Sequence, residues 1–420
     1  MGNQSQNIAV SKADRDILRE LVKYVQMIAV SPEQTQKRKD WIAHNRLYLA
    51  KPMILCFPEG AWRECLPTAA MKTSTPLLQE LEWKLRSIIY TYEVLKDDWV
   101  VDPVFNLNWV HKFTDCGFEI PYERVDTLGS FRWEPPLKNL SDLQKLKPVR
   151  IEIDKPETQR RIELAQEIFG DILPVQLRGS FWWSLGVMQK AIYLRGLEQI
   201  MLDMHDNPSW LHELISFLSN EVMDWLTFLE SNGYLTLNNQ ADYVGSGGVG
   251  YIDELPGKEF NPMQIRCADL WGFAEAQELV GVSPEMFNEF FLKYTIPILA
   301  RFGLNCYGCC EPVHDKLHLL KQIPRLRRIS ISPWADVTIA AQELGDKVIF
   351  SYKPNPAPLA AFKFDESAVR ESLVQVMQIV RKNNCILEII MKDTHTVQND
   401  PSRLSRWVEI AKEIRDEIYQ

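Results

Sequence analysis

Long apolar runs, runs of positive charge and closely spaced cysteines are all scarce in this 420-residue sequence. No stretch approaches the ~18 consecutive apolar residues that a membrane-spanning helix needs. Lysine and arginine number 47 against 56 aspartates and glutamates, which gives a net charge of -9, and they form no extended Lys/Arg-rich segment. Nucleic acids and anionic membrane surfaces are bound through clustered positive charge, so neither is expected as a partner.

Eight cysteines are too few for a disulfide-stapled secreted scaffold of this length. Residues 1–10 also lack the basic and then apolar order of a signal peptide. We therefore expect a cytoplasmic protein with reduced thiols. Three of the cysteines nevertheless gather between residues 306 and 310, a local density that the composition does not explain.

What is present is helical periodicity alternating with short apolar runs. A hydrophobic fraction of 46% with 25% charged residues is ordinary for a globular protein. Helices are expected to begin at the prolines at 208, 284 and 401 and to end near 233, 303 and 418. Short apolar runs, expected as strands, occupy 52–57, 99–101, 172–177, 234–237, 269–273, 304–307, 328–331, 348–351 and 386–390.

Continuously apolar strands that alternate with helices are typical of a parallel sheet covered by helices. Eight or nine such strands favour an α/β fold of the closed (β/α)8, TIM-like barrel type over an open doubly wound sheet. We expect an N-terminal helical extension over residues 1–50 and the barrel domain over 51–420. An inserted excursion at about 103–150 is either a lid or merely an insertion.

In a barrel, chemistry gathers where strands end and the following loops begin. Glu275 follows one expected strand and would act as an acid or base if burial raised its pKa; a solvated carboxylate in a first helical turn is the alternative. Trp182 would line an aromatic pocket or belong to the core. The other residues expected to contact a substrate at these points are Glu59, Asn239, Asp242 and Tyr243.

The residues Tyr307, Gly308, Cys309 and Cys310 end another expected strand and would place thiolates at the barrel mouth. A catalytic zinc takes three thiolate, imidazole or carboxylate ligands and keeps one position open. Cys309 or Cys310 could join Asp393 or His395, brought over from the last strand, in such a site. The alternatives are that the cysteines pack as small apolar side chains and that the histidine makes a structural hydrogen bond.

Residues 245–250, Gly-Ser-Gly-Gly-Val-Gly, match the dinucleotide-binding pattern GxGxxG. That motif requires a helix to begin at once and to present its N-terminus to a pyrophosphate. The residues that follow lack helical periodicity and include Pro256. We therefore interpret the segment as a flexible or tightly turning loop at the barrel rim.

Residues 150–418 resemble the uroporphyrinogen decarboxylase superfamily, in particular its corrinoid-linked methyltransferase branch. The resemblance rests on residues 194–198 followed by 206–208, on 281–287, on 307–310, and on 393–395 with 400–401. The decarboxylases of this family carry an arginine-rich turn that holds porphyrin carboxylates. Here residues 56–62 read Cys-Phe-Pro-Glu-Gly-Ala-Trp, so Glu59 is expected to help select another substrate.

The resemblance implies transfer of a methyl group from a small methylated substrate to the cobalt of a separate corrinoid protein. Zinc and the cobalamin of that partner are the implied cofactors. Cys309 matches one zinc ligand of the family, Tyr307 replaces its histidine and is expected at the substrate, and Asp393 or His395 stands near the third. Glu275 and Asp393 are the expected catalytic residues. The aromatic residues near the mouth favour a methoxylated aromatic substrate, that is, O-demethylation.

Two alternatives stay open. One is a metal-free decarboxylase or lyase that acts on a small carboxylic acid and uses Glu275, Asp242 or Lys392 for proton transfer. The other is a non-catalytic binding protein built on the same barrel. The sequence also leaves a homodimer open.

Overall fold

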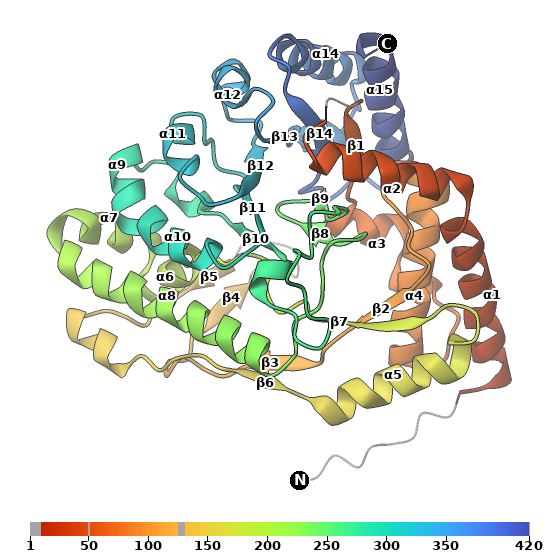
Figure 1. Ribbon diagram of the computed structural model, residues 1–420, viewed down its shortest axis with the longest axis horizontal. Helices are drawn as coiled ribbons and strands as arrows, with labels where there is room; N and C mark the ends of the chain where they lie inside the picture. The colour runs from red at the N-terminus through yellow and green to blue at the C-terminus, as the bar shows by residue number, and fades with distance from the viewer. Residues whose placement is uncertain (1–9, 49–50, 125–130, 420) are drawn as a thin grey trace.

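A parallel sheet lies at the centre of the computed structural model, which describes residues 10–48, 51–124 and 131–419 (Figure 1). All neighbouring strands of this six-stranded sheet run parallel. Their order across the sheet is β1 (Met53–Cys56), β14 (Ile386–Met391), β13 (Ile349–Tyr352), β12 (Leu326–Ile331), β11 (Leu304–Tyr307) and β10 (Trp271–Ala274). The α/β class predicted from the sequence is confirmed.

A closed eight-stranded barrel is not shown by the backbone pairing of the described residues. β2 (Phe105–Asn108) and β7 (Val175–Arg178) form a separate parallel pair. Segment 234–238 lies between β7 and β10 and is held by side-chain hydrogen bonds. On one side, the Gly179 amide donates to the Thr236 hydroxyl at 2.7 Å. On the other side, the Asn238 side chain donates to the Trp271 carbonyl and accepts from the Trp271 amide. Because side chains satisfy these backbone groups, no strand ladder forms there, and the strand predicted at 234–237 is absent.

The strand predicted at 99–101 is also wrong. These residues are not part of any strand, and the acidic pair that precedes them binds β1 instead. The Asp97 carboxylate accepts from the Cys56 amide at 3.0 Å, and the Asp98 carboxylate accepts from the Ile54 amide at 2.8 Å. Side-chain acceptors thus replace a strand along this edge of β1.

Helices surround the sheet, as Figure 1 shows. The predicted helices at 208, 284 and 401 are present, although the second is divided by a π-helical turn at Asn288–Leu292. Two helices precede β1, in the region predicted as a helical extension; the domain boundary at residue 50 stays a prediction. The helices are α1 (Lys12–Ala29), α2 (Pro32–Asn45), α3 (Trp62–Cys65), α4 (Pro76–Tyr90), α5 (Lys155–Phe169), α6 (Met188–Arg195), α7 (Leu197–Asp206), α8 (Pro208–Ser231), α9 (Pro284–Phe287), α10 (Lys293–Leu299), α11 (Leu317–Leu320), α12 (Val337–Leu344), α13 (Ala357–Ala360), α14 (Glu366–Lys382) and α15 (Ser402–Ile418).

Short antiparallel pairs complete the fold. β3 (His111–Phe113) pairs with β6 (Ile151–Ile153), and β4 (Tyr122–Arg124) pairs with β5 (Phe131–Trp133). These strands fall in and just after the predicted excursion, which therefore has regular structure of its own; its residues 125–130 lie outside the described residues. In the part of the chain that the structure describes, no helix is long and apolar enough to cross a membrane.

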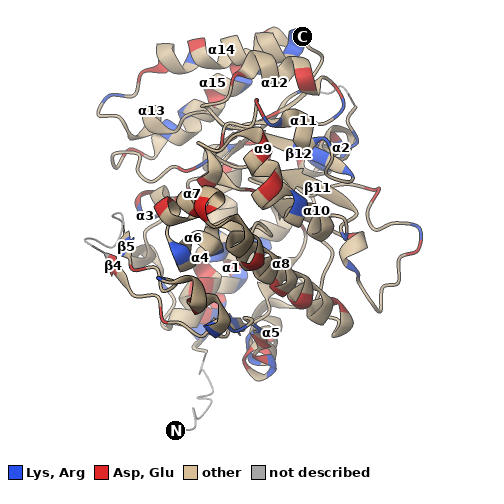
Figure 2. Ribbon diagram, turned by 90° about the vertical axis from the view of Figure 1, so that its left-hand side faces the viewer, with Lys and Arg blue, Asp and Glu red and all other residues tan. Residues whose placement is uncertain are grey.

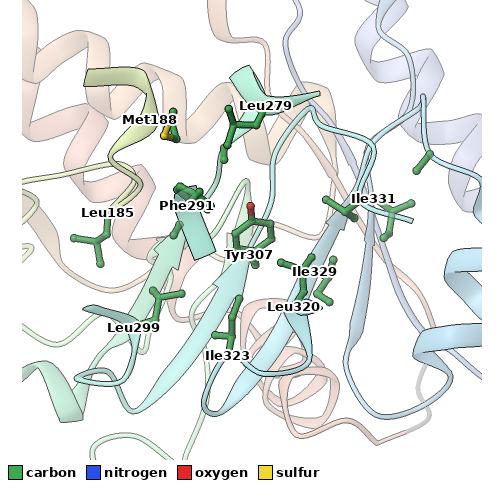
Figure 3. Close-up of a cluster of buried hydrophobic side chains, with 14 of the residues drawn as sticks. Leu185, Met188, Leu279, Phe291, Leu299, Tyr307, Leu320, Ile323, Ile329 and Ile331 are labelled. Carbon is green, nitrogen blue, oxygen red and sulfur yellow. The ribbon is translucent and has the colours of Figure 1, made fainter. Parts of the chain in front are cut away.

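The main apolar core joins the strands to the helices that cover them. Figure 3 shows part of it, with Phe291, Leu299, Tyr307 and Ile329 among the side chains drawn. A second apolar cluster lies between α1, α4, α5 and β2. On the side of the molecule shown in Figure 2, acidic and basic residues are mixed along the helices rather than gathered into one basic face.

The GxGxxG segment makes a tight turn at 245–247 between the short strands β8 (Tyr243–Val244) and β9 (Gly248–Val249), which confirms the tightly turning alternative, and residues 244–250 are buried. Gly245 and Gly247 have φ values of +63° and +109°, which side chains other than glycine rarely adopt. No helix follows, in agreement with the sequence-based interpretation. The glycines let this hairpin approach the central sheet closely.

Gly248→Ala is expected to lower the free energy of unfolding by about 1–3 kcal/mol, because inserting a methyl group into a packed interior causes strain. The new methyl would overlap the guanidinium of Arg328, which is buried and held in an ion pair with Glu388. Urea unfolding measures the change. Gly257→Ala is the matched control, since nothing lies within 4 Å of its added carbon; equal stability of the two variants would contradict the packing argument.

Candidate functional site

A cavity of about 680 Å³ lies against β2, β7 and β10. Asn106 and Asn108 of β2 and Arg178 of β7 line it together with Phe273 of β10. Its aromatic walls are Trp99, Phe181, Trp182, Trp183, Tyr243, Trp271 and Phe273. A concave site of this size, with aromatic walls and a few polar groups, is typical of a small-molecule site.

Of the two basic residues that line the cavity, one forms an ion pair within the described residues and the other does not. The Arg178 guanidinium lies 2.8 Å from the Asp242 carboxylate, and Asp242 also accepts from the Gln240 amide at 3.0 Å. Burial raises the pKa of Asp242 to about 6, although the guanidinium opposes the shift. Lys84 of α4 donates to the carbonyl of Asn106. Arg178 is therefore neutralised by a carboxylate, whereas Lys84 has a carbonyl partner.

The β8–β9 hairpin connects this cavity to a second polar cluster. Tyr243 lines the cavity, and three residues later the hydroxyl of Ser246 lies 2.9 Å from the Lys392 ammonium and 3.3 Å from Cys309 Sγ. The ammonium is 3.5 Å from Cys309 Sγ and stands over the ring of Trp183, a cavity wall, at 5.8 Å. The cluster thus lies directly behind the aromatic wall.

The two adjacent cysteines have opposite pKa shifts. A hydrogen bond from the Cys310 thiol, 3.4 Å away, and the nearby Lys392 ammonium lower the pKa of Cys309 to about 7. The same contact raises the pKa of Cys310 well above the usual range for a thiol. Burial lowers the pKa of Lys392, but the charges around it, first Tyr243 and then Cys309, raise it above its ordinary value. Cys309 is therefore divided between thiol and thiolate near pH 7, and above that pH the cluster holds a thiolate and an ammonium side by side.

Thiolate absorbance near 240 nm is expected to rise in a step centred near pH 7, because Cys309 is protonated below its pKa of about 7 and ionised above it. Cys309→Ser should remove this step. Cys385→Ser should retain it, since burial raises the pKa of Cys385 to about 11. A step near pH 7 that survives in Cys309→Ser would show that another group titrates there.

The predicted metal ligands are brought together only in part. Cys310 Sγ lies 3.5 Å from Asp393 Oδ2, and Cys309 is adjacent. His395 lies against Gly60 instead. Among the described residues no three His, Cys, Asp or Glu side chains are arranged to hold a metal ion, and the Lys392 ammonium already places positive charge beside Cys309. These side chains, as they are placed, do not form a zinc site; whether the protein binds zinc elsewhere or after rearrangement is not tested by the structure.

Glu275 is buried, with 3% of its surface exposed, at the end of β10. Burial, together with the nearby carboxylates of Glu278 and Glu311, raises its pKa to about 8. Its carboxyl also accepts from the Gln277 amide at 3.1 Å. The solvated first-turn carboxylate considered from the sequence is therefore wrong, and Glu275 is a neutral acid at pH 7.

The other predicted substrate residues differ in their positions. Trp182, Asp242 and Tyr243 line the cavity. The carboxylate of Glu59 accepts from the Asp393 amide at 2.7 Å, and burial raises the pKa of Glu59. Three of the four thus line the cavity, whereas Glu59 contacts Asp393, which follows Lys392 of the adjoining cluster.

Two further predicted residues lie away from the cavity lining. Asn239 donates to the Leu255 carbonyl at 2.6 Å, while its neighbour Asn238 lines the cavity. Tyr307 is 1% exposed and packs against Phe287 and Phe291, as Figure 3 shows for Phe291. In the structure Tyr307 therefore belongs to the apolar core.

Sequence reasoning missed Ser246 and Lys84. Ser246 sits inside the GxGxxG segment, where closely spaced glycines signal a backbone packed against other groups, and this signal could have indicated a buried turn. Lys84 is one of several charged residues on α4, and nothing in the local pattern separates it from a solvent-facing lysine.

Comparison with known proteins gives no family. No family model matches the chain, and no curated protein matches it. Among solved structures, it is similar to a methyltransferase from Methanosarcina mazei, with 10% sequence identity and a TM-score of 0.47 over 91% of this chain and 99% of that one. A similarity at this level assigns neither a fold family nor a function.

Proposed function

We propose that the protein is a methyltransferase that moves a methyl group from a small methylated substrate to the cobalt of a separate corrinoid protein. The observation that supports this proposal is the Lys392 ammonium, which is 4% exposed and lies beside the wall of an aromatic cavity. Loss of a methyl group leaves negative charge on the heteroatom that carried it. A cation fixed in a water-poor site stabilises that charge in the transition state.

The overall reaction balances as follows for a methyl ether. The ether, a cob(I)alamin acceptor and one proton give the free hydroxyl compound and methylcob(III)alamin. In this proposal Lys392 stabilises the charge on the leaving oxygen from behind the Trp183 ring, and Glu275, which follows β10 outside the cavity lining and is mostly protonated at pH 7, is the proton source. Cys309 and Ser246 hold the ammonium in place. A zinc ion would supply Lewis-acid assistance, but no step of this proposal uses one.

The aromatic walls favour a flat substrate. Trp182 and Trp183 come from the loop after β7, and Trp271 and Phe273 come from β10. Aromatic rings of ligands pack against such side chains in offset or edge-on geometry. A methoxylated aromatic compound is therefore the proposed methyl donor, which makes the reaction an O-demethylation.

The proposal is tested by mixing the purified protein with cob(I)alamin and a panel of methoxylated aromatics, methylamines and methylthiols. Formation of methylcobalamin, followed by absorbance, is expected with a methoxylated aromatic. Its absence with every donor would refute methyl transfer, and carbon dioxide release from an aromatic acid would favour the decarboxylase. Elemental analysis of the same preparation decides whether zinc is bound.

A further inference from the structure

We infer that the ligand of the cavity carries a carboxylate, which binds at the end of the cavity formed by Lys84, Arg178 and Asn108. The inference rests on the proposed function in one respect only, that this cavity is the substrate site. Beyond that function, it specifies the charge of the substrate and the residues that bind it. It holds whichever methyl group is transferred and whichever acceptor receives it.

The cavity has an excess of positive charge although the whole protein has a net charge of -9. Its charged lining residues are Lys84, Arg178 and Asp242. Arg178 and Asp242 neutralise each other at 2.8 Å, so one positive charge remains. Within the described residues no carboxylate lies at ion-pair distance from Lys84, whose ammonium contacts a backbone carbonyl and the ring of Phe105 at 5.1 Å.

Nearby acidic residues compensate Lys84 only in part, because each also has a cation of its own. Glu80, on the same helix, lies 3.4 Å from Arg161. Asp102, next to the Arg178 pair, lies 3.7 Å from Arg38. Burial has the largest effect on Lys84 and lowers its pKa, Glu80 opposes the shift, and the neighbouring Arg178 adds to it; because the net shift is downward, the ammonium is only partly compensated in the free protein. A bound anion would supply the missing compensation.

The number of uncompensated charges selects among anions. One ammonium matches a carboxylate, which carries a single negative charge, better than a phosphate monoester, which carries about two at neutral pH. The aromatic walls next to this end accept a ring. The ligand class is therefore an aromatic carboxylic acid.

Isothermal titration calorimetry without cobalamin tests the inference, with 4-methoxybenzoate and its neutral isostere 4-methoxybenzamide as probes. The wild-type protein is expected to bind the benzoate at least tenfold more tightly than the amide. Lys84→Met should raise the Kd for the benzoate about tenfold and leave that for the amide unchanged, and Lys84→Arg should retain the preference. Lys321→Met, which removes an exposed lysine paired with Glu343, is the matched control and should behave as wild type.

Equal binding of the two probes by the wild-type protein would overturn the inference even if Lys84→Met failed to fold. An unchanged preference in a folded Lys84→Met variant would overturn it as well. The proposed function fails separately: charge-selective binding without methyl transfer refutes the transferase and retains the carboxylate site. If methyl transfer occurred and the Kd values of neutral ethers and of benzoates were equal, the carboxylate site would be refuted and the proposed function retained.

Discussion

Lys392→Met is expected to lower kcat/KM for methyl transfer at least 100-fold. The variant retains an unbranched apolar side chain of similar length but loses the ammonium that stands over Trp183. Removing one preorganised group that stabilises developing charge costs about 100- to 1,000-fold in rate. Initial rates of methylcobalamin formation over a range of donor concentrations measure the effect.

The same variant should raise the pKa of the Cys309 thiol above about 7, because the ammonium 3.5 Å away helps to stabilise the thiolate. This spectroscopic change separates loss of the charge from general misfolding. Lys347→Met removes an exposed lysine and serves as the control, with unchanged kinetics and thiol titration. Full activity of a folded Lys392→Met protein would show that the ammonium does not assist the reaction.

Glu388→Gln is expected to lower the free energy of unfolding by about 3–5 kcal/mol, the usual effect of removing one partner of a buried ion pair. Glu388 is fully buried on β14, and the equally buried Arg328 lies 2.8 Å from it. His44 of α2 lies 3.2 Å away, and Ser351 donates to the same carboxylate. Neutral glutamine would leave the guanidinium without a counter-charge inside the protein.

The pH dependence of this pair has a definite sign. Burial raises the pKa of Glu388, but Arg328 and His44 outweigh it and hold the pKa far below the usual range. Stabilisation by a carboxylate with a lowered folded-state pKa is complete above its unfolded value of about 4.3 and is lost as the pH falls below it. The difference in unfolding free energy between wild type and Glu388→Gln should therefore shrink below about pH 4.

Urea unfolding at pH 7 and pH 3.5 measures both effects. Glu413→Gln is the control, since Glu413 pairs with Arg370 and Arg406 at the surface and surface pairs contribute less than about 1 kcal/mol. Equal losses in the two glutamine variants would mean that the buried network does not stabilise the fold.

The sequence predicted most of the parallel strands because each is a short, continuously apolar run between helices. This holds for β1, β11, β13 and β14, which are buried along their whole length. It failed at 99–101 and 234–237, where apolar runs lie beside the sheet but Asp97, Asp98 and Asn238 bind its backbone. Apolar character predicts burial, whereas the hydrogen-bond partner depends on residues distant in sequence.

The candidate site was predictable to a similar extent. Cys309, Cys310 and Asp393 meet because the carboxyl ends of parallel strands lie at one edge of a sheet. The ammonium of Lys392 could not be placed between them from the sequence, because its position depends on Ser246 of the distant hairpin. The surroundings of Lys84 could not be predicted either, because its hydrogen-bond acceptor lies on β2 and the neighbouring cation Arg178 lies on β7.

The central claim is that a cation beside the aromatic cavity promotes methyl transfer to a corrinoid. Its most direct test is incubation of the wild-type protein with cob(I)alamin and 4-(trideuteromethoxy)benzoate, followed by mass spectrometry of both products. We predict trideuteromethyl cobalamin and an equal amount of 4-hydroxybenzoate. Unchanged cobalamin, with the benzoate either intact or converted to the decarboxylated ether, would contradict the account.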